Sequence, residues 1–600
     1  MKYLKIIKKA KWLWAGLLLA MSAVISTVMV QYLLLDANLF DNLSDKKWQL
    51  NILCVAVVYM FLFFITANLR FSLIAAHTFF VVLGFVNYFV YLLRDNEFIF
   101  SDMRSIATGL SVAGNYELVL HDRGWHVILL SIILLLLARC VKLHFDKKWM
   151  VRLISGAGIV MMCVVLGQNT AKMNTETWEQ KGSYLNGYVL NFALSIRDSF
   201  VLAPEAYDLE MIGQLEREYE TVETNVQGFY LEKKPTIIVV MNESFADLSV
   251  VGPIQTNEPL TPFMDSLEEN TIKGYALSSV FGAKTPNSEW EFMTGGSMAF
   301  LPAGSVVYQQ YMSDTPASIV STLKNEEYTC IAMHPYYETG WSRNLIYPKL
   351  GFDESYFIES FDQTQLVRKY VSDKEMYRRI IKRYEERGVD ENLFIMSISM
   401  QNHGGYTTHY DNFEENYYKL GRSYTDANQY FSLIRESDDA LRELVTYFEQ
   451  VDEPVEIVFF GDHQPSLTNK FFEILNGKGV SGLTLGELQN LYTVPFFIWT
   501  NYDTEEVRVD MTSLNYLSTM ALDRAGIDLS PYHQFMKELM TVIPAINARG
   551  YYSLEKDRYL HVEDAKGIEA EWLSKYESLQ YNGVFDLKNT SEIFFPYGIE

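Results

Sequence analysis

The first 170 residues contain five long apolar stretches separated by short polar segments. The stretches are about Trp12–Leu35, Leu50–Ala67, Phe71–Leu93, Trp125–Val141 and Val151–Gln168. Each holds 17 to 24 residues, and a helix of that length crosses a hydrocarbon layer about 30 Å thick. Four more stretches follow the first, so it is not a simple cleaved signal peptide. We therefore predict five transmembrane helices over residues 1–168, with buried helices of a soluble domain as the alternative.

Basic residues lie unevenly around these stretches, and their distribution predicts the orientation of the chain. On one side lie Lys2, Lys5, Lys8, Lys9, Lys11, Arg70, Arg139, Lys142, Lys147, Lys148 and Arg152. The other side has fewer basic residues, and acidic residues are mixed with them. The more basic side is expected in the cytoplasm. With five spans, an odd number, every residue after Gln168 is then expected outside the cell.

The pattern of apolar positions changes after these stretches. Residues 169–230 are expected to form a juxtamembrane connector, in which Pro204 interrupts the chain and Leu209–Tyr219 has helical periodicity. After Lys234, short continuous apolar runs rich in β-branched residues alternate with segments of helical pattern. Such runs are typical of strands buried on both faces of a sheet.

The alternation of strands and helices predicts an α/β fold with a mostly parallel central sheet. The expected strands are Thr236–Met241, Tyr328–Met333, Leu393–Ser399, Val455–Phe460 and Val494–Thr500. The expected helices include Pro316–Lys324, Asp373–Arg387 and Ser423–Phe448. We assign residues 231–545 to this domain and residues 546–600 to a C-terminal extension that packs on it or follows it.

Charge and cysteine content exclude some classes of function and of stabilisation. The formal net charge of -24 and the sequence pI near 4.9 argue against a nucleic-acid partner, because phosphate binding needs a basic face. Three of the four cysteines fall in or beside apolar stretches, which leaves Cys330 alone in the rest of the chain. The large domain therefore has no internal disulfide and depends on its core. No cysteine spacing indicates structural zinc.

Residues able to bind a metal or transfer a proton follow four of the expected strands. Glu243, His334 and His403 follow three of them, and the pair Asp462 and His463 follows a fourth. In parallel sheets, ligands collect at the carboxyl ends of the strands. Taken singly, a carboxylate here could cap a helix and a histidine could be a satisfied core residue. Their recurrence at equivalent positions favours a common site, because an isolated buried charge is unstable.

A candidate nucleophile lies in the segment Lys284-Thr285-Pro286-Asn287. Threonine followed by proline is typical of a helix start, with Thr285 as the N-cap and Pro286 as the first helical residue. That geometry would place the hydroxyl beside free backbone N–H groups that bind phosphate. A plain capping threonine is the alternative. A threonine hydroxyl needs a base or a metal to activate it, and oxygen ligands with one imidazole suit manganese or magnesium.

Taken together, these segments resemble the lipoteichoic acid synthase branch of the sulfatase and alkaline phosphatase superfamily. The resemblance covers nearly the whole chain, from the apolar stretches through the connector to the α/β domain. It implies a membrane-anchored phosphoglycerol transferase with one bound divalent cation, manganese or else magnesium. The metal ligands that it implies are Glu243, Thr285, Asp462 and His463, and the implied substrate residues are His334, Trp341, Arg343 and His403.

The resemblance also implies a reaction sequence. Thr285 would attack phosphatidylglycerol and release diacylglycerol, and glycerol phosphate would then pass from Thr285 to a glycolipid or a growing polyglycerolphosphate chain. His403 would protonate the leaving alkoxide and later take a proton from the acceptor. Arg343 would bind the non-bridging phosphate oxygens. Alternatives with the same motifs are a phosphoethanolamine transferase and a glycan-directed phosphoglycerol transferase. A catalytically silent membrane protein is an alternative of another class.

The chain departs from the family pattern at two positions near the implied headgroup site. Tyr336 stands two residues after His334, where an acidic residue is usual, and Ser342 stands between Trp341 and Arg343, where asparagine is usual. Both departures weaken the substrate assignment more than the reaction class. True sulfatases need a Cys or Ser in a C/S-x-P-x-R motif, and this chain has none at Thr285. Sulfate ester hydrolysis is therefore not expected.

Overall fold

The structure is a computed structural model of the whole chain. It describes residues 2–34, 43–94, 97–105, 120–171, 173, 182–220, 233–312, 316–421, 424–479 and 482–596. The chain divides into two compact units, one of Met1–Phe200 with Pro302–Gly304 and one of Val201–Leu301 with Ser305–Glu600. The division at Phe200 falls inside the expected connector, residues 169–230, parts of which lie outside the described residues. The limits of that connector and of the other expected domains remain predictions.

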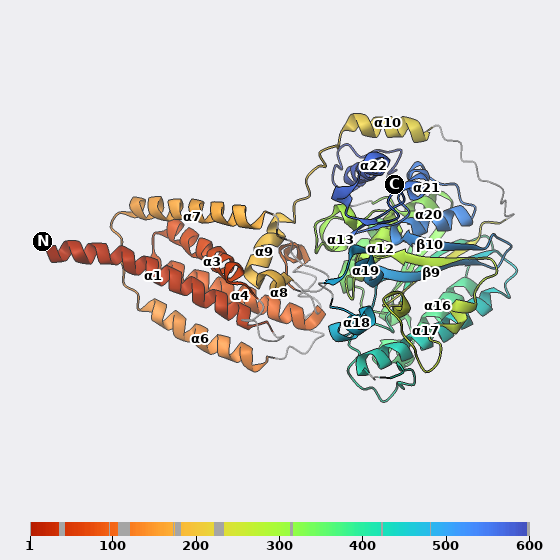
Figure 1. Cartoon of the computed structure of the whole chain (residues 1–600), viewed down its shortest axis with the longest axis horizontal. Coiled ribbons are helices and arrows are strands. Elements are labelled where there is room, and N and C mark those ends of the chain that lie inside the picture. The colour runs from red at the N-terminus through yellow and green to blue at the C-terminus, as the bar shows by residue number, and fades with distance from the viewer. Residues whose placement is uncertain are drawn as a thin grey trace. The chain divides into compact units, whose positions relative to one another are not determined.

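The first unit is helical (Figure 1). Its main helices are α1 (Lys2–Tyr32), α3 (Asp45–Thr66), α4 (Leu69–Arg94), α6 (Asp122–Arg139), α7 (Lys148–Thr170), α8 (Gly182–Asn186) and α9 (Tyr188–Arg197). Four of the described helices are long and apolar enough to cross a membrane: Lys11–Tyr32, Asp45–Thr66, Leu69–Leu92 and Lys148–Thr170. On α7, large apolar side chains such as Val160 and Met161 are exposed, as expected for a helix that faces lipid.

By length and apolar composition, four of the described helices could span a membrane, whereas the sequence predicts five spans. The expected fourth span, Trp125–Val141, is the one not among these four; it lies largely on α6, whose 18 residues include Asp122, Arg123 and Arg139 at the two ends. The uncharged part of α6 is therefore shorter than a typical span. Leu35, the last residue of the first expected span, lies outside the described residues. Five spans, and the extracytoplasmic side that follows from an odd number, thus remain predictions.

The second unit is built on an eight-stranded sheet with the order β10-β2-β9-β8-β1-β7-β3-β4. The strands are β1 (Thr236–Asn242), β2 (Thr271–Leu277), β3 (Tyr328–Met333), β4 (Glu354–Tyr356), β7 (Asn392–Ile398), β8 (Val455–Gly461), β9 (Thr493–Thr500) and β10 (Val507–Ser513). Only β9 runs antiparallel to its neighbours β8 and β2, and the other pairs are parallel. The predicted α/β fold with a mostly parallel sheet is confirmed.

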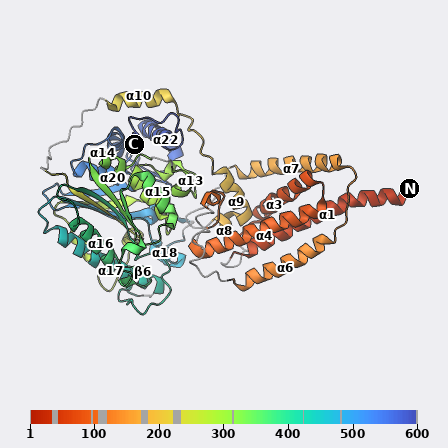
Figure 2. The ribbon, with the colours of Figure 1, turned by 180° about the vertical axis from the view of Figure 1, so that it is seen from behind.

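Helices cover both faces of this sheet (Figures 1 and 2). On one face lie α12 (Thr285–Thr294), α14 (Ile319–Asn325), α15 (Arg343–Leu350) and α20 (Leu514–Arg524), whose apolar side chains share a core with Ile237, Val239 and Met241 of β1. On the other face lie α16 (Asp373–Glu385) and α17 (Thr425–Phe448). Ser423, the expected first residue of α17, lies outside the described residues. The shorter helices are α11 (Pro262–Ser266), α13 (Val307–Gln310), α18 (Asn469–Asn476) and α19 (Leu485–Gln489).

A separate apolar cluster joins the last third of the chain to a helix from the expected connector. Tyr219 of α10 (Leu209–Glu220) packs with Phe535 of α21 (Pro531–Val542) and Tyr576 of α22 (Gly567–Val584). The hydroxyl of Tyr219 also donates to Glu538 at 2.6 Å. The three-stranded sheet β11 (Ile546–Asn547), β12 (Gly550–Ser553) and β13 (Arg558–Leu560) contributes to the same cluster. A small hairpin, β5 (Leu366–Val367) and β6 (Tyr370–Val371), completes the strands.

Candidate active site

Four parallel strands in the middle of the sheet end beside one another. In the order β8-β1-β7-β3, each strand is parallel to the next, so their carboxyl ends lie at one edge of the sheet. Glu243 directly follows β1, and Asp462 and His463 directly follow β8. His403 lies in the turn after β7, and His334 directly follows β3. The parallel register therefore brings together residues that are more than 200 positions apart in the sequence.

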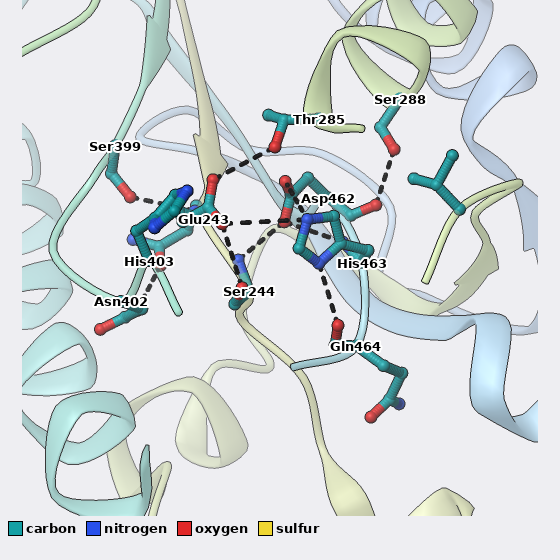
Figure 3. Close-up of polar contacts among 12 residues, drawn as sticks. Glu243, Ser244, Thr285, Ser288, Ser399, Asn402, His403, Asp462, His463 and Gln464 are labelled. Atoms are coloured by element: carbon teal, nitrogen blue, oxygen red, sulfur yellow. Dashed lines mark hydrogen bonds and ion pairs between the residues drawn. The ribbon is translucent and has the colours of Figure 1, made fainter. Parts of the chain in front are cut away.

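Glu243, Asp462 and His463 form a compact buried cluster in which their side chains point toward one another (Figure 3). Their potential ligand atoms all lie within 4.8 Å of one another. The Nε2 atom of His463 lies 3.2 Å from Oδ2 of Asp462 and 3.8 Å from Oε1 of Glu243. The three residues are 3%, 0% and 1% exposed, respectively. This set of carboxylate oxygens and one imidazole nitrogen is a candidate metal site.

The hydrogen bonds around the cluster indicate that a cation fits between its side chains. His463 Nδ1 lies 2.9 Å from the backbone oxygen of Gln464, so a neutral ring donates from Nδ1 and keeps a lone pair on Nε2. Asp462 Oδ1 accepts from the backbone N–H groups of Ser244 and His463, whereas Oδ2 and His463 Nε2 have no hydrogen-bond partner among the described residues. Two acceptors thus face each other, and a divalent cation would satisfy both.

The pKa of Asp462 is consistent with this arrangement. Burial raises the pKa of the Asp462 carboxyl above its ordinary value, and the neighbouring Glu243 carboxylate raises it further. The protein alone therefore disfavours the charged form of this side chain. A cation among the three residues would reverse that effect, because it stabilises the carboxylate more than the neutral acid.

Thr285 lies at the start of α12 with its hydroxyl toward the cluster (Figure 3). The hydroxyl donates to Oε2 of Glu243 at 3.3 Å. The expected N-cap position of Thr285 is wrong by one residue, because Lys284 is the N-cap and Thr285 is the first helical residue. Lys284 has a left-handed backbone with φ 70°, so the chain turns into the helix one residue earlier than the Thr-Pro pattern predicts. The hydroxyl is thereby directed to Glu243 and does not cap the helix.

Arg343 and His334 belong to a second buried cluster, which the sequence analysis did not fully identify. The guanidinium of Arg343 donates from Nε and Nη2 to Oε2 of Glu289 at 3.1 and 2.9 Å. Its Nη1 lies 3.1 Å from Nε2 of His334, whose Nδ1 lies 3.0 Å from the backbone oxygen of Ile398. Burial and the neighbouring guanidinium hold the pKa of His334 well below its ordinary value. His334 is therefore a neutral acceptor for Arg343.

Glu289 was missed because a glutamate inside a helix is usually a surface residue. Its signal in the sequence was its position four residues after Thr285, which places both residues on one face of the helix. Arg343 and Glu289 are each 1% exposed. The helix that begins with Thr285 thus also holds the arginine expected at the substrate.

Trp341 and Tyr336 lie near this cluster but are only partly buried. Trp341 and Ser342 have consecutive left-handed backbone conformations, with φ 54° and 62°, which are unfavourable for residues other than glycine. They turn the chain directly into α15, which begins with Arg343. The ring of Tyr336 lies 6.1 Å from that of His334. An aromatic ring therefore occupies the position where the family pattern has an acidic side chain.

His403 differs from the other expected site residues because its side chain is exposed. Desolvation by the surrounding protein and the nearby His463 and Lys369 nevertheless lower the pKa of its ring. The hydroxyl of Tyr370 lies 3.2 Å from His403 Nδ1, which leaves Nε2 as the nitrogen available for proton exchange. Tyr370 could not be found from the sequence, because nothing in its local pattern links the β5–β6 hairpin to the turn after β7.

Comparison with known proteins agrees with this geometry. Residues 235–527 match the Sulfatase family. A Rhizobium meliloti protein named for cyclic beta-1,2-glucan modification is 27% identical over 70% of this chain. Lipoteichoic acid synthase 1 of Bacillus subtilis is 24% identical over 40% of this chain. The alignments span 65% and 38% of the length of these two relatives.

Among solved structures, the fold is similar to that of the Streptococcus pyogenes phosphoglycerol transferase GacH in complex with sn-glycerol-1-phosphate. The TM-score is 0.54 at 20% sequence identity, and the match covers 66% of this chain and 99% of that chain. The family match lies over the part of the chain that holds the eight-stranded sheet and the buried cluster of Glu243, Asp462 and His463. This chain therefore carries a sulfatase-family domain, with lipoteichoic acid synthases among its relatives.

Proposed function

We propose that this protein transfers phosphoglycerol from phosphatidylglycerol to an acceptor hydroxyl through a covalent phosphothreonine intermediate at Thr285. The observation that carries the proposal is the Thr285 hydroxyl, which donates to one carboxylate of a buried cluster of possible metal ligands. Glu243, Thr285, Asp462 and His463 would hold one divalent cation, for which we propose Mn²⁺, or else Mg²⁺. When bound, the cation would lower the pKa of the hydroxyl and offset charge at the phosphoryl group.

In the first half-reaction, Oγ of Thr285 attacks the phosphorus of the donor. The hydroxyl of Thr285 donates to Oε2 of Glu243, and this carboxylate would take the hydroxyl proton as the bond to phosphorus forms. As the new P–O bond to Thr285 forms, the bond to diacylglycerol breaks, and the leaving alkoxide takes a proton from Nε2 of His403. The exposure of His403 supports this role, because a bulky lipid must reach the proton donor.

In the second half-reaction, the acceptor hydroxyl attacks the phosphorus of the phosphothreonine. Nε2 of His403 now takes the proton of the acceptor, and the bond from phosphorus to Oγ of Thr285 breaks. The threonine oxygen takes back the proton held by Glu243, which regenerates the hydroxyl, and His403 is again protonated for the next donor. One imidazole thus serves both half-reactions, because the second is the chemical reverse of the first.

Arg343, His334 and Trp341 are proposed to bind the glycerol phosphate headgroup. A guanidinium carries five N–H bonds, and three of them are directed to Glu289 and His334. The remaining two, one on Nη1 and one on Nη2, form the edge that would bind non-bridging phosphate oxygens. Glu289 and His334 would then fix the orientation of Arg343 before the donor arrives.

The acceptor is proposed to be a glycolipid or a growing polyglycerolphosphate chain, which would make the protein a lipoteichoic acid synthase. A glycan-directed phosphoglycerol transferase is the second candidate. Two observations favour it: one relative, aligned over 70% of this chain, is named for glucan modification, and Tyr336 stands where the resemblance expects an acidic residue. Both candidates share the donor half-reaction.

The catalytic domain is proposed to lie outside the cytoplasm, anchored by five membrane spans. The support is the basic residues at the N-terminal end of α1 and around the link between α6 and α7, which are expected in the cytoplasm. Protease added to intact protoplasts should digest the domain after Gln168. Full protection of that domain would overturn the orientation.

The proposed function is tested by mass spectrometry of lipid products formed by the full-length protein. Liposomes of phosphatidylglycerol should yield diacylglycerol in the presence of Mn²⁺, and liposomes of phosphatidylethanolamine should not. Thr285→Ala should lose diacylglycerol release, whereas Thr294→Ala, at the other end of the same helix, should retain it. Turnover of phosphatidylethanolamine alone would replace phosphoglycerol by phosphoethanolamine as the group transferred. Absence of turnover of either lipid with a full equivalent of bound metal would contradict the proposal.

A further inference from the structure

The β5–β6 hairpin carries an arginine in a backbone conformation that favours glycine. Leu366 pairs with Val371 and Val367 with Tyr370, so that Arg368 and Lys369 form a two-residue turn. Arg368 has φ 55°, whereas such turns ordinarily place glycine, asparagine or aspartate at positions of positive φ. A side chain kept at a strained position indicates that its contacts compensate for the strain.

The contacts of Arg368 hold the turn that carries His403. Its Nη2 donates to the backbone oxygens of Gln401 and His403 at 2.9 and 2.7 Å, and its Nη1 donates to Oε1 of Gln429 at 3.2 Å. The guanidinium also lies over the rings of Tyr370, Tyr406 and Tyr410, with centroid distances of 5.8, 5.5 and 6.0 Å. The residue is 3% exposed.

This guanidinium is not neutralised by a direct ion pair. Within the described part of the chain, none of its hydrogen-bond partners is a carboxylate, whereas Arg343 in the same unit pairs with one carboxylate and Arg383 with two. A buried charge without a counter-ion destabilises the fold unless hydrogen bonds and ring faces compensate for its lost hydration. Arg368 therefore contributes less to the core than an apolar residue would, and its specific effect is to fix two carbonyl groups.

Two glycines in the turn that Arg368 holds leave open space beside its backbone. Gly404 and Gly405 directly follow His403, and no atom lies within 4 Å of the position where either would carry a Cβ. Gly405 has φ +98°, which only glycine adopts readily. The exposed residue His403 thus lies between Asn402, which is buried, and two glycines without side chains to pack.

Tyr370, on the strand that follows the turn of the hairpin, restrains the imidazole ring itself. Its hydroxyl lies 3.2 Å from Nδ1 of His403, and the two ring centroids are 5.5 Å apart. If Nδ1–H donates to this hydroxyl in both protonation states of the ring, Nε2 is the only nitrogen that gains and loses the proton. The exchanging nitrogen is then the same in both half-reactions.

We propose that Arg368 and Tyr370 are positioning residues for His403: Arg368 fixes the backbone of the turn, and Tyr370 fixes the tautomer and orientation of the ring. This inference rests on the proposed role of His403 as proton donor and acceptor. It assigns the hairpin β5–β6 to the transfer reaction, although neither residue touches the candidate metal ligands in the contacts of the described residues.

The test is a double-mutant cycle on the full-length protein, with diacylglycerol release from phosphatidylglycerol as the measured rate. We expect His403→Ala to lower kcat by about 10²- to 10⁴-fold, and Tyr370→Phe or Arg368→Lys to lower it by about tenfold with KM for the lipid little changed. In the His403→Ala background, Tyr370→Phe should cause no further loss. Tyr447→Phe and Arg435→Lys are the matched controls, since Tyr447 also bonds through its hydroxyl and Arg435 also lies over a tyrosine ring.

The outcomes separate this inference from the proposed function. If Tyr370→Phe lowers the rate equally with and without His403, its effect does not pass through His403 and the inference is wrong. If His403→Ala is slow but Tyr370→Phe and Arg368→Lys are as fast as the controls, the inference is wrong and the role of His403 stands. Normal turnover by His403→Ala contradicts both. Thermal unfolding and bound metal, measured on every variant, identify any that fail to fold, and Tyr370→Phe removes only one hydroxyl.

Discussion

Two buried charged clusters lie near the same edge of the sheet, and they differ in how their charge is balanced. Arg343 donates twice to Oε2 of Glu289, so that one positive and one negative group neutralise each other. Glu243, Asp462 and His463 bring two carboxylates and one imidazole together without a positive partner among the described residues. In the first cluster a guanidinium balances a carboxylate within the protein, whereas the second is a candidate site for a cation.

The two clusters differ in whether the protein itself supplies the opposite charge that each buried group needs. The pair of Arg343 and Glu289 is in place before any ligand arrives, and it joins the helix of Thr285 to the start of α15. In the carboxylate cluster, two backbone N–H groups fix Oδ1 of Asp462, and Oδ2 has no hydrogen-bond partner among the described residues. Oδ2 is therefore an acceptor that a cation could bind. Substitutions in the two clusters should therefore have different consequences.

The largest effect is expected on metal binding by the cluster of Glu243, Asp462 and His463. Asp462→Asn should weaken divalent metal binding by on the order of 10²-fold or more, because an amide does not offset the charge of the ion. Metal content of the purified full-length protein, measured after dialysis at low free Mn²⁺, checks this expectation. Glu291→Gln is the matched control, since Glu291 is also a buried carboxylate, on the second half of α12 and outside the cluster. A full equivalent of Mn²⁺ in Asp462→Asn would exclude Asp462 as a ligand.

A smaller effect, on stability, is expected in the balanced pair. Glu289→Gln leaves the buried guanidinium of Arg343 without its counter-charge and should destabilise the domain by about 3–5 kcal/mol. The double variant Glu289→Gln with Arg343→Met should recover most of this loss, because neither charge remains. Thermal unfolding of the full-length protein in detergent measures both changes. If the double variant regains stability and also normal transfer, Arg343 does not bind the phosphodiester.

The stability of the protein is expected to depend on pH through Glu291, a buried carboxyl with no ion pair among the described residues. Burial raises the pKa of Glu291 to about 7, against the hydrogen bonds from Met298 and Ser279 that lower it. Between pH 4.5 and about 7 the Glu291 carboxyl is protonated in the folded protein but ionised in the unfolded chain. The free energy of unfolding is therefore highest below pH 4.5, as far as Glu291 determines it, and falls as the pH rises to about 7. Glu291→Gln should stabilise the protein by about 2 kcal/mol at pH 8. Unfolding midpoints at pH 5 and pH 8 should therefore differ less in the variant than in the wild type.

The smallest effect is expected for a pair that solvent already surrounds. Lys382 and Glu386 lie one turn apart at the C-terminal end of α16. The Nζ atom of Lys382 is 3.7 Å from Oε1 of Glu386, and more than half of each side chain is exposed. Lys382→Ala should change the free energy of unfolding by less than about 0.5 kcal/mol. The same thermal unfolding experiment measures it. A loss as large as that of Glu289→Gln would show that burial is not what separates the two kinds of pair.

The sequence predicted the central part of the sheet well but its edges poorly. Strands β1, β3, β7, β8 and β9 are continuous apolar runs buried on both faces, and each was predicted within one or two residues. Strands β2 and β10 alternate buried and partly exposed positions and contain charged residues such as Lys273 and Arg508. Their position depends on pairing between distant segments, which no local pattern reveals.

The candidate site was predictable where chemistry-bearing residues directly follow strands. Glu243, Asp462 and His463 were selected on that ground, and the structure brings them together. Glu289 and Tyr370 were missed because their importance lies in contacts with Arg343 and His403, far away in the sequence. The start of α12 was misplaced by one residue, since the left-handed conformation of Lys284 is not encoded by a glycine.

The most direct test of the proposed mechanism is the mass of the peptide that contains Thr285 after the first half-reaction. Full-length protein would be mixed with phosphatidylglycerol and Mn²⁺ without acceptor, quenched in acid, digested and analysed by mass spectrometry. We predict a phosphoglycerol adduct on Thr285 that disappears when an acceptor is added before the quench. Diacylglycerol release at a normal rate by Thr285→Ala, without an adduct in the wild type, would contradict a covalent intermediate at this residue.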